Sequence, residues 1–338
     1  MNPHDLTGQG PDHRASAANG RSALLPSSTA ASSSTPPSSS SSKAAAPVGT
    51  VSAAPPRRGW RDLESRLLAV VGRLTERDRQ LCRLLDEHRV LTTAQIADVA
   101  FTGERRARMR LAELYALDVL DRFRPQAWAS PAPYHWVLGP LGAALRAAET
   151  GHDLADVSWR RRLAHDLAAS QRLTHLVGTN GIFTALLKAA RTGPGCALVE
   201  WWSEQRCAKE WGEVVRPDGY GIWTDDETSV PFLVEYDNGT ERLDRLAQKL
   251  DGYARLAQAA GHPTWVLFSF PSPRREAEAR RVLTHNTVPV ATAARTTLAG
   301  PDGPIWLPVT SSPVISGRRR LRLAELAGLT ASDPARSQ

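Results

Sequence analysis

The sequence predicts a mixed α and β fold in two parts: a small helical part that ends in a β-hairpin, and a larger part with the order α-β-β-β-α-β. Apolar residues recur at helical spacing in three successive segments between residues 60 and 120. Two short runs of β-forming residues follow near residue 130, and runs rich in Val, Trp, Phe and Tyr alternate with helical segments after residue 195. A chain of 338 residues is long enough for two such domains.

Composition indicates the class of protein. Hydrophobic residues make up 41% and charged residues 23% of the chain, as in a globular protein rather than a fibre. No apolar run approaches the roughly 18 to 20 residues that cross a bilayer, and no apolar segment follows a basic start. We therefore expect neither a membrane partner nor secretion. Residues 1–58 contain almost no large apolar side chain, so they are predicted to be a disordered Ser/Ala/Pro-rich tail.

The charge of the chain and its cysteine content indicate what kind of partner and which compartment to expect. Lys and Arg outnumber Asp and Glu by 42 to 35, which gives a formal charge of +7 and a pI near 9.8. This sign suits a polyanionic partner such as nucleic acid. Cys82, Cys196 and Cys207 have neither disulfide-framework nor zinc-ligand spacing, so a reducing cytoplasm is the expected location.

Two helices are predicted first in the N-terminal part. The run RDLESRLLAVVGRL places apolar residues on one helical face, and a second helix follows Thr75. Thr75 and Asp78 have the spacing of a capping box, with the shorter acid. The expected buried positions of these two helices are Leu63, Leu67, Val70, Val71, Leu81, Leu84 and Leu85.

Counted from the helix that follows Thr75, the second helix of the motif is short, covers TTAQIADVAF with Thr92 or Thr93 as its cap, and is expected to bury Ile96 and Val99. The third helix of the motif covers GERRARMRLAELYALDVL. At 100° per residue the third helix has an apolar edge and a cationic edge. The apolar edge consists of Ala107, Leu111, Leu114 and Tyr115, and the cationic side of Arg105, Arg106, Arg108 and Arg110.

The runs VLDRFRP and YHWVLG, joined by the loop QAWASPAP, are typical of a hairpin wing, and a closing helix is expected over residues 141–148. Three helices and a hairpin predict a winged helix-turn-helix over residues 59–150, with double-stranded DNA as its partner. Its arginines would contact phosphates or guanine edges in the major groove, and Arg122 and Arg124 of the wing would add phosphate contacts. A solvated arginine face, or use of the winged helix as a homodimer interface, is the alternative.

The larger domain is expected over residues 158–312. A long helix is predicted over residues 159–190, with Gly178 to Gly181 as its point of interruption. Three strands then follow over CALVEWW, EVVRPDGYGIW and VPFLVEYD, and after them a helix over residues 241–260. The remaining elements are a strand over TWVLFSF, a helix over REAEARRVL and short strands over VPVATAA and IWLPV. Residues 313–338 are predicted to be a C-terminal basic helix and tail.

Acidic residues at the ends of two of these strands predict a metal site. Asp218 follows Arg216-Pro217, and Glu235 comes 17 residues later near the end of the next strand. Carboxylates that meet at the edge of a sheet suit Mg²⁺, which prefers oxygen ligands and can activate a bound water. Lys249 on the following helix could add a positive charge there, although a surface lysine is an equally good interpretation.

With Pro217-Asp218 and the later Glu235, this order of elements resembles the PD-(D/E)xK nuclease core, a restriction-endonuclease-like fold, over about residues 171–270. The resemblance implies that Asp218 and Glu235 bind the metal and that a lysine two residues after the Glu orients the attacking water. Asp237 stands at that position here. Some members carry the lysine on the next helix, and in this chain Lys249 would take its place.

The strings HWVLG and VEYDNGTE, with the segments around them, are similar to the replication-relaxation family of actinobacterial and Gram-positive mobile elements. The resemblance covers nearly everything after Thr75. It implies a role in plasmid replication and in relaxation of plasmid DNA, through nicking or origin binding. The competing hypothesis is a non-enzymatic regulator or initiator whose α/β domain serves for dimerisation or docking.

Five further residues near the site have structural interpretations. Glu204 could be a further metal ligand, but an exposed position in a turn is expected, and Glu241 should lie in the first turn of its helix. His175 could face the sheet and the site, but a satisfied or exposed histidine is the expected role. Tyr236 alternates with Glu235 and should point to the opposite sheet face, and Tyr253 fits an apolar helix stripe. The sequence has no phosphate-binding loop and no dinucleotide fingerprint, so no small-molecule cofactor is expected.

Overall fold

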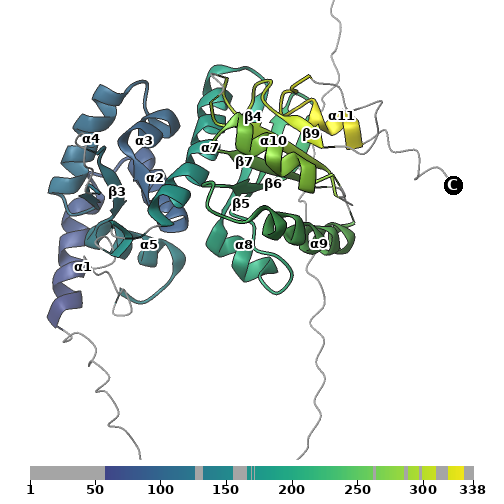
Figure 1. Ribbon diagram of the computed structural model, residues 1–338. Helices are drawn as coiled ribbons and strands as arrows, with labels where there is room; N and C mark the ends of the chain where they lie inside the picture. The colour runs from purple at the N-terminus through teal and green to yellow at the C-terminus, as the bar shows by residue number, and fades with distance from the viewer. Residues whose placement is uncertain are drawn as a thin grey trace, which may run out of the picture. The chain divides into compact units, whose positions relative to one another are not determined.

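The computed structural model describes residues 58–125, 132–154, 166–168, 170, 172–261, 264–284, 288–296, 299–309 and 319–330. Apart from Arg58, the predicted N-terminal tail lies outside these ranges, as do residues 126–131 of the predicted wing loop. The N-terminal elements are α1 (Arg58–Val71), α2 (Glu76–His88), β1 (Leu91–Thr92), α3 (Thr93–Ala100), α4 (Glu104–Ala116), β2 (Leu120–Phe123), β3 (His135–Leu138) and α5 (Pro140–Thr150) (Figure 1).

Both predicted capping sites start helices. The Thr75 side chain accepts from the Asp78 N–H, and the Asp78 carboxylate accepts from the Thr75 N–H at 2.7 Å. Thr92 forms the second capping box, with Gln95. Each box satisfies donors that a helix N-terminus leaves without intrahelical partners, so it fixes where the helix begins.

The N-terminal helices pack around a three-stranded sheet with the order β1-β3-β2. All its pairs are antiparallel, and Leu120 lies opposite Leu138 in the hairpin. The two-residue strand β1 is absent from the sequence prediction because it is defined only by its pairing with the distant β3. The predicted apolar edge of α4 is confirmed, since Ala107, Leu111 and Leu114 are fully buried.

The second group of elements forms a mixed sheet of six strands, with the order β4-β5-β6-β7-β8-β9. Pairs β4–β5, β5–β6 and β8–β9 are antiparallel, whereas β6–β7 and β7–β8 are parallel. The strands are β4 (Cys196–Ser203), β5 (Gly219–Asp225), β6 (Thr228–Tyr236), β7 (Trp265–Phe270), β8 (Val290–Ala294) and β9 (Leu307–Val309), and the helices are α7 (Arg172–Thr192), α8 (Glu204–Trp211), α9 (Leu243–Ala260), α10 (Pro273–Val282) and α11 (Leu326–Thr330).

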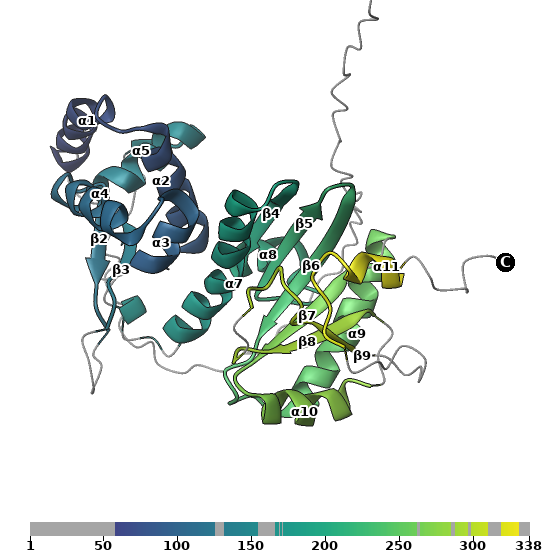
Figure 2. The same ribbon diagram turned by 90° about the horizontal axis from the view of Figure 1, so that it is seen from above.

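Different helices cover the two faces of this sheet (Figure 2). On one face, Phe183 and Leu186 of α7 pack against Phe232 and Val234 of β6. On the other face, α9 and α10 pack against Leu233 and the inner residues of β7. Because side chains alternate along β6, residues 233 and 235 face α9 while residues 232, 234 and 236 face α7. This alternation decides which helix each candidate site residue meets.

Helix α7 also bonds to the N-terminal elements. The Asn180 side-chain amide donates to the main-chain oxygens of His88 and Val90, at 3.2 and 2.8 Å. The Gln95 side chain donates to the Val177 oxygen at 2.7 Å. Buried amide hydrogen bonds of this kind are directional, so they give the contact a defined register.

Three predictions about helix boundaries need correction. The predicted long helix is not continuous, because Ser170 is not helical and α7 begins at Arg172, while residues 159–165 lie outside the described ranges. Gly178 does not interrupt α7. An added Cβ there would lie 2.1 Å from the Tyr236 ring, so this glycine allows the helix to approach β6 closely. Glu241 precedes α9, which begins at Leu243 after the cap residue Arg242.

The remaining differences lie in α8, β5 and the C-terminal segment. Residues 204–211 form α8 instead of a turn, and β5 begins at Gly219, so residues 213–218 of the second predicted strand are not extended sheet. Among the described C-terminal residues, Arg319, Arg320 and Arg322 precede α11, and α11 itself carries no basic residue. No helix in the described part of the chain is long and apolar enough to cross a membrane.

Candidate functional site

Asp218 lies at the entrance to β5, held by two neighbours. Gly219 pairs with Val234, so Asp218 occupies the next position, opposite Glu235. Its Oδ2 accepts the Tyr236 N–H at 2.7 Å, and its Oδ1 lies 2.9 Å from Nε2 of His175 on α7. The carboxylate is therefore fixed by the end of one strand and by a helix.

Glu235 is almost completely buried, and it lies on the α9 side of β6. Its Oε2 accepts from Lys249 Nζ at 2.7 Å, and its Oε1 accepts from the Tyr253 hydroxyl. Both donors belong to α9. Lys249 also reaches Glu241 Oε2 at 3.3 Å, so the ammonium bridges a buried and a half-buried carboxylate.

The two carboxylates are electrostatically coupled. Burial and, after it, the charge of Asp218 raise the pKa of Glu235 to about 7, although Lys249 and the Tyr253 hydroxyl act in the opposite direction. Burial opposes the charged form of His175, but the hydrogen bond and charge of Asp218, with the charge of Glu204, raise its pKa above the ordinary value. The Lys249 pKa is raised despite burial, because Glu235 stabilises the ammonium. Strongly shifted groups gathered in one place are typical of functional sites.

The structure thus brings together Asp218, Glu235 and Lys249, as the sequence predicts. It also holds the two carboxylates toward different helices, since Asp218 bonds to α7 and Glu235 to α9. Mg²⁺ commonly binds proteins through one or two carboxylates and keeps several waters, but both oxygens of Glu235 already accept hydrogen bonds, from Lys249 and from Tyr253. An ion bound to Glu235 would have to displace either the Lys249 ammonium or the Tyr253 hydroxyl.

No larger ligand set exists in the described residues. Among them, no group of three or more His, Cys, Asp or Glu side chains is arranged to hold a metal ion. Glu204 begins α8 and acts on the site through its charge near His175. An ion held by Asp218 and Glu235 would complete its coordination with water or phosphate oxygens.

The sequence favours structural roles for two residues that the structure places at the site. Tyr253 does occupy the buried stripe of α9, but its hydroxyl also binds Glu235. His175 is satisfied, as expected, and its partner is Asp218. The spacing of Leu246, Leu250 and Tyr253 could have placed Tyr253 against β6, whereas nothing in the local sequence of α7 indicates the partner of His175. Tyr236 points toward α7, as its alternation with Glu235 predicts.

Asp237 has a different partner from the one its motif position suggests. It is buried, and its Oδ2 accepts from Arg275 Nε at 2.7 Å. Arg295 donates to the Asp237 main-chain oxygen at 2.7 Å and lies over the Tyr236 ring. The position that would carry a lysine is therefore part of an ion pair that joins β6 to α10.

The arginines of α4 fall into two groups. Arg105, Arg106 and Arg108 are exposed. Arg106 bonds only to Thr102 and Arg108 pairs weakly with Glu104, while Arg105 has no ion pair or hydrogen bond within the described residues. Arg110 differs, because it binds the buried carboxylate of Asp78 at 2.6 Å and also pairs with Glu113.

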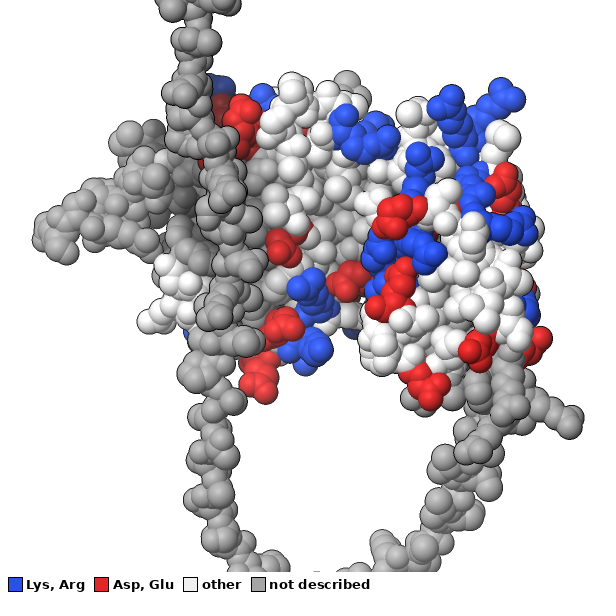
Figure 3. All heavy atoms as spheres, turned by 180° about the vertical axis from the view of Figure 1, so that it is seen from behind, with Lys and Arg blue, Asp and Glu red and all other residues white. Residues whose placement is uncertain are grey.

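The wing arginines stack on aromatic rings. The Arg122 guanidinium lies 4.5 Å from the centre of the Tyr115 ring and 4.1 Å from that of Tyr134. Arg124 lies 3.7 Å from the same Tyr134 ring. Arg122 is half-buried and Arg124 is exposed, so Arg124 is the freer of the two. Seen from behind, cationic side chains gather over the N-terminal elements at the upper right (Figure 3).

A family model described as replication-relaxation matches residues 82–265, more than half of the 338 residues. The chain belongs to the replication-relaxation family. The matched segment of this replication-relaxation protein begins within α2 and ends at the start of β7, so it contains both the arginine face of α4 and the three site residues Asp218, Glu235 and Lys249. No curated protein and no solved structure matches the chain.

Proposed function

We propose that this replication-relaxation protein binds double-stranded DNA through a winged helix-turn-helix and acts in the replication or transfer of a plasmid or other mobile element. The order α2-β1-α3-α4-β2-β3, with β3 between β1 and β2, supports this assignment. The observation that carries it is the exposed cationic face of α4, where Arg105 and Arg106 have no carboxylate partner within the described residues.

Helix α4 would enter the major groove, which is wide enough for one helix. Arg105, Arg106 and Arg108 would contact phosphates or guanine edges, and Arg124 would contact the backbone from the wing. Arg110 and Arg122 would have a supporting role, because Asp78 and two tyrosine rings already engage them. In this proposal the exposed arginines of α4 recognise the DNA. Arg110 and Arg122, with their partners, hold α4 and the wing in position.

The test of DNA binding is the double variant Arg105→Ala/Arg106→Ala. Its affinity for duplex DNA should fall, and the slope of log affinity against log salt should decrease by roughly one unit per lost phosphate contact. Arg319→Ala/Arg322→Ala, which removes two exposed arginines near the C-terminus, is the matched control and should bind like wild type. Equal slopes for all three proteins would show that α4 does not face DNA.

A second activity, Mg²⁺-dependent nicking of DNA, is proposed for the sheet domain. Its elements α7, β4, β5, β6, α9 and β7 have the α-β-β-β-α-β order of the PD-(D/E)xK nucleases, with α8 inserted. The specific observation in its favour is Lys249, which reaches Glu235 from α9 while Asp237 at the motif position pairs with Arg275. Lys249 would thus supply the charge that the motif lysine supplies elsewhere.

Bound Mg²⁺ would supply an activated water and charge stabilisation at the phosphate. Asp218 and Glu235 would hold the ion, and the Tyr236 N–H and His175 would keep the Asp218 carboxylate in place. The Lys249 ammonium would stay charged because its pKa is raised, and it would orient the attacking water or stabilise negative charge on the phosphate. Tyr253 would hold the second oxygen of Glu235 in a fixed orientation.

Incubation of supercoiled plasmid with the protein and Mg²⁺ tests this activity. Wild type should convert the plasmid to open circles, and Asp218→Ala and Glu235→Ala should reduce the rate by on the order of 100-fold or more. Glu278→Ala on α10 is a control acid outside the site. If wild type and both site variants leave the plasmid equally intact while still binding it, the protein is a non-enzymatic regulator or initiator with an inactive α/β domain.

A further inference from the structure

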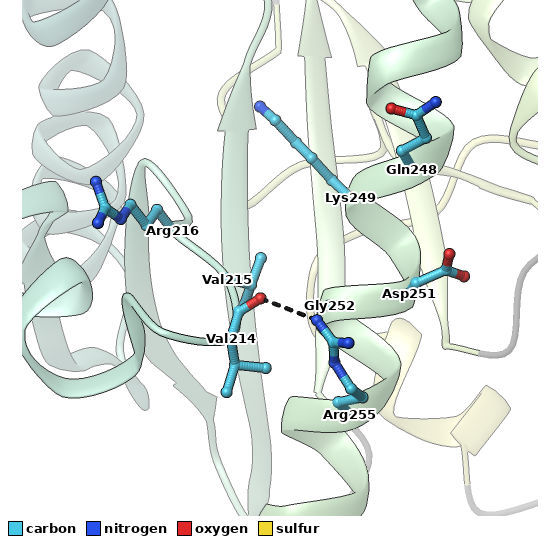
Figure 4. A pocket seen from close by; sticks show the side chains of 8 residues that line it. All are labelled: Val214, Val215, Arg216, Gln248, Lys249, Asp251, Gly252 and Arg255. Carbon is cyan, nitrogen blue, oxygen red and sulfur yellow. Dashed lines mark hydrogen bonds between the residues drawn. The ribbon is translucent and has the colours of Figure 1, made fainter. Parts of the chain in front are cut away.

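A groove beside the candidate nicking site has the properties of a DNA-backbone channel. It lies between α9 and residues 214–216, which precede β5, and it encloses about 390 Å³ (Figure 4). Arg216, Lys249 and Arg255 line it, with Asp251 as its acid. We call this feature the Arg216–Arg255 groove.

The groove adjoins the carboxylates. The Lys249 side chain contributes to its lining while Nζ bonds to Glu235 at 2.7 Å. Arg216 precedes Asp218 by two residues, so both walls of the groove lead to the site. The two carboxylates do not line the groove themselves, and Lys249 and the segment 216–218 connect it to them.

Among the described residues, the two arginines of the groove lack a carboxylate partner, whereas Lys249 pairs with Glu235 and Glu241. Arg216 Nε donates to the Gly212 main-chain oxygen at 3.3 Å, and Arg255 donates to that of Val214 at 3.5 Å. Neither guanidinium has a carboxylate partner within 4.0 Å in the part of the chain that the structure describes. Guanidinium groups that bond only to carbonyl oxygens retain donors for a phosphate.

The cations do not converge on one point. In Figure 4 the Arg216 head points away from α9, Lys249 extends from α9 up and across the neighbouring strand, and Arg255 lies lower, where it donates to the Val214 carbonyl. A site for one small anion would gather these groups around a single centre. Separated cations along an open groove instead suit successive phosphates of a polymer.

The base of the groove is apolar and closely packed. Val214 is 40% exposed, and Gly252 packs so tightly that an added Cβ would lie 2.9 Å from the Val214 oxygen. An exposed valine between two arginines offers an apolar contact for a sugar. The arginines would bind the phosphates on either side of that sugar. The lining therefore matches the alternation of sugar and phosphate in a nucleic-acid strand.

We propose that the Arg216–Arg255 groove binds the sugar-phosphate backbone of the DNA that enters the Asp218–Glu235–Lys249 site. This inference rests on the proposed function and adds a second DNA contact to the one made by α4. Arg216 and Arg255 each contact one phosphate, and Val214 contacts the deoxyribose between them. Lys249 belongs to both features, because its side chain lines the groove and its ammonium bonds to Glu235.

The test uses the full chain with Arg216→Ala/Arg255→Ala, in the wild-type background and combined with Arg105→Ala/Arg106→Ala. The groove variant should weaken DNA binding and lower the salt slope by about two units, since two phosphate contacts are lost. The combined variant should show the sum of both losses, because the sites are separate. Both arginines are exposed, so thermal unfolding should match that of the control Arg319→Ala/Arg322→Ala.

Each outcome has a distinct meaning. If wild type binds no DNA, the proposed function and the groove both fail. If only Arg105→Ala/Arg106→Ala weakens binding, the groove proposal alone is overturned. Inorganic phosphate at constant ionic strength should not compete for the groove. If it abolishes the difference between wild type and Arg216→Ala/Arg255→Ala, the groove is a site for free phosphate and the backbone assignment is wrong.

Discussion

Two buried carboxylates, Asp78 in the N-terminal part and Glu235 in the sheet, have opposite electrostatic behaviour. Asp78 is 0% and Glu235 2% exposed. Burial opposes the charge of Asp78, but hydrogen bonds from Arg110 and Thr75 outweigh it and lower the pKa. Burial and the charge of Asp218 raise the pKa of Glu235 to about 7. Similar side-chain exposure thus accompanies opposite shifts: Arg110 and Thr75 stabilise the charged form of Asp78, whereas deeper burial and then the charge of Asp218 disfavour that of Glu235.

The contrast is between a buried acid with a structural role, Asp78, and one for which a functional role is proposed, Glu235. Asp78 caps α2 and fixes Arg110 of α4, so its charge stabilises the fold. Glu235 keeps its charge only with an energetic cost, which a bound cation would relieve. Natural proteins retain such costs mainly at sites of function.

The pH dependence of stability should show the contrast most strongly. The pKa of Glu235 rises from 4.5 to about 7 on folding, so the folded state binds more protons between these values. The contribution of Glu235 to stability is thus present below pH 4.5 and is lost as pH rises to about 7. The free energy of unfolding of wild type relative to Glu235→Gln should fall by on the order of 2 to 3 kcal/mol over this window. Urea unfolding at both pH values measures it, and parallel pH profiles would show that Glu235 is not perturbed.

The next largest effect should come from Asp78→Asn. This change removes the ion pair with Arg110 while keeping the size of the side chain, and it should lower the free energy of unfolding at pH 7 by about 2 kcal/mol. The value is below that of a fully buried pair because Arg110 is one quarter exposed. Asp86→Asn, at an exposed pair with Arg146, should change stability by less than about 0.5 kcal/mol. Similar small losses for both variants would remove the structural role assigned to Asp78.

A smaller effect is expected from Tyr253→Phe. Loss of the hydroxyl leaves Glu235 Oε1 without this donor and should reduce stability by about 1 kcal/mol at pH 8. The loss should be smaller at pH 5, where Glu235 is protonated. Tyr134→Phe, which retains the ring beneath Arg122 and Arg124, is the control and should be nearly neutral. A loss that is independent of pH would show that Tyr253 acts only by packing.

Local patterns in the sequence were sufficient to predict many of these features. Thr75 with Asp78, and the spacing of Ala107, Leu111 and Leu114, act within one helix, and the structure confirms them. The meeting of Asp218 with Glu235 followed from the expectation that adjacent strands pair. Such signals depend on near neighbours, which the sequence displays directly.

Features that depend on distant partners could not be predicted. Strand β1 exists through its pairing with β3, and Arg110 was assigned to DNA because Asp78, 32 residues earlier, gave no sign of reaching it. Gly178 looked like a helix break, although its small size serves the packing of Tyr236. In each case a tertiary contact determines the role of a residue whose local sequence suggests another.

The most direct measurement of the central claim is a carbon-13 NMR titration of the Glu235 carboxyl, assigned with Glu235→Gln, with and without Mg²⁺. We predict a midpoint near 7 without the ion and a lower midpoint when Mg²⁺ is present. A midpoint near the ordinary 4.5 that does not respond to Mg²⁺ would contradict it, because Glu235 would then be neither strained by Asp218 nor able to bind the ion with it.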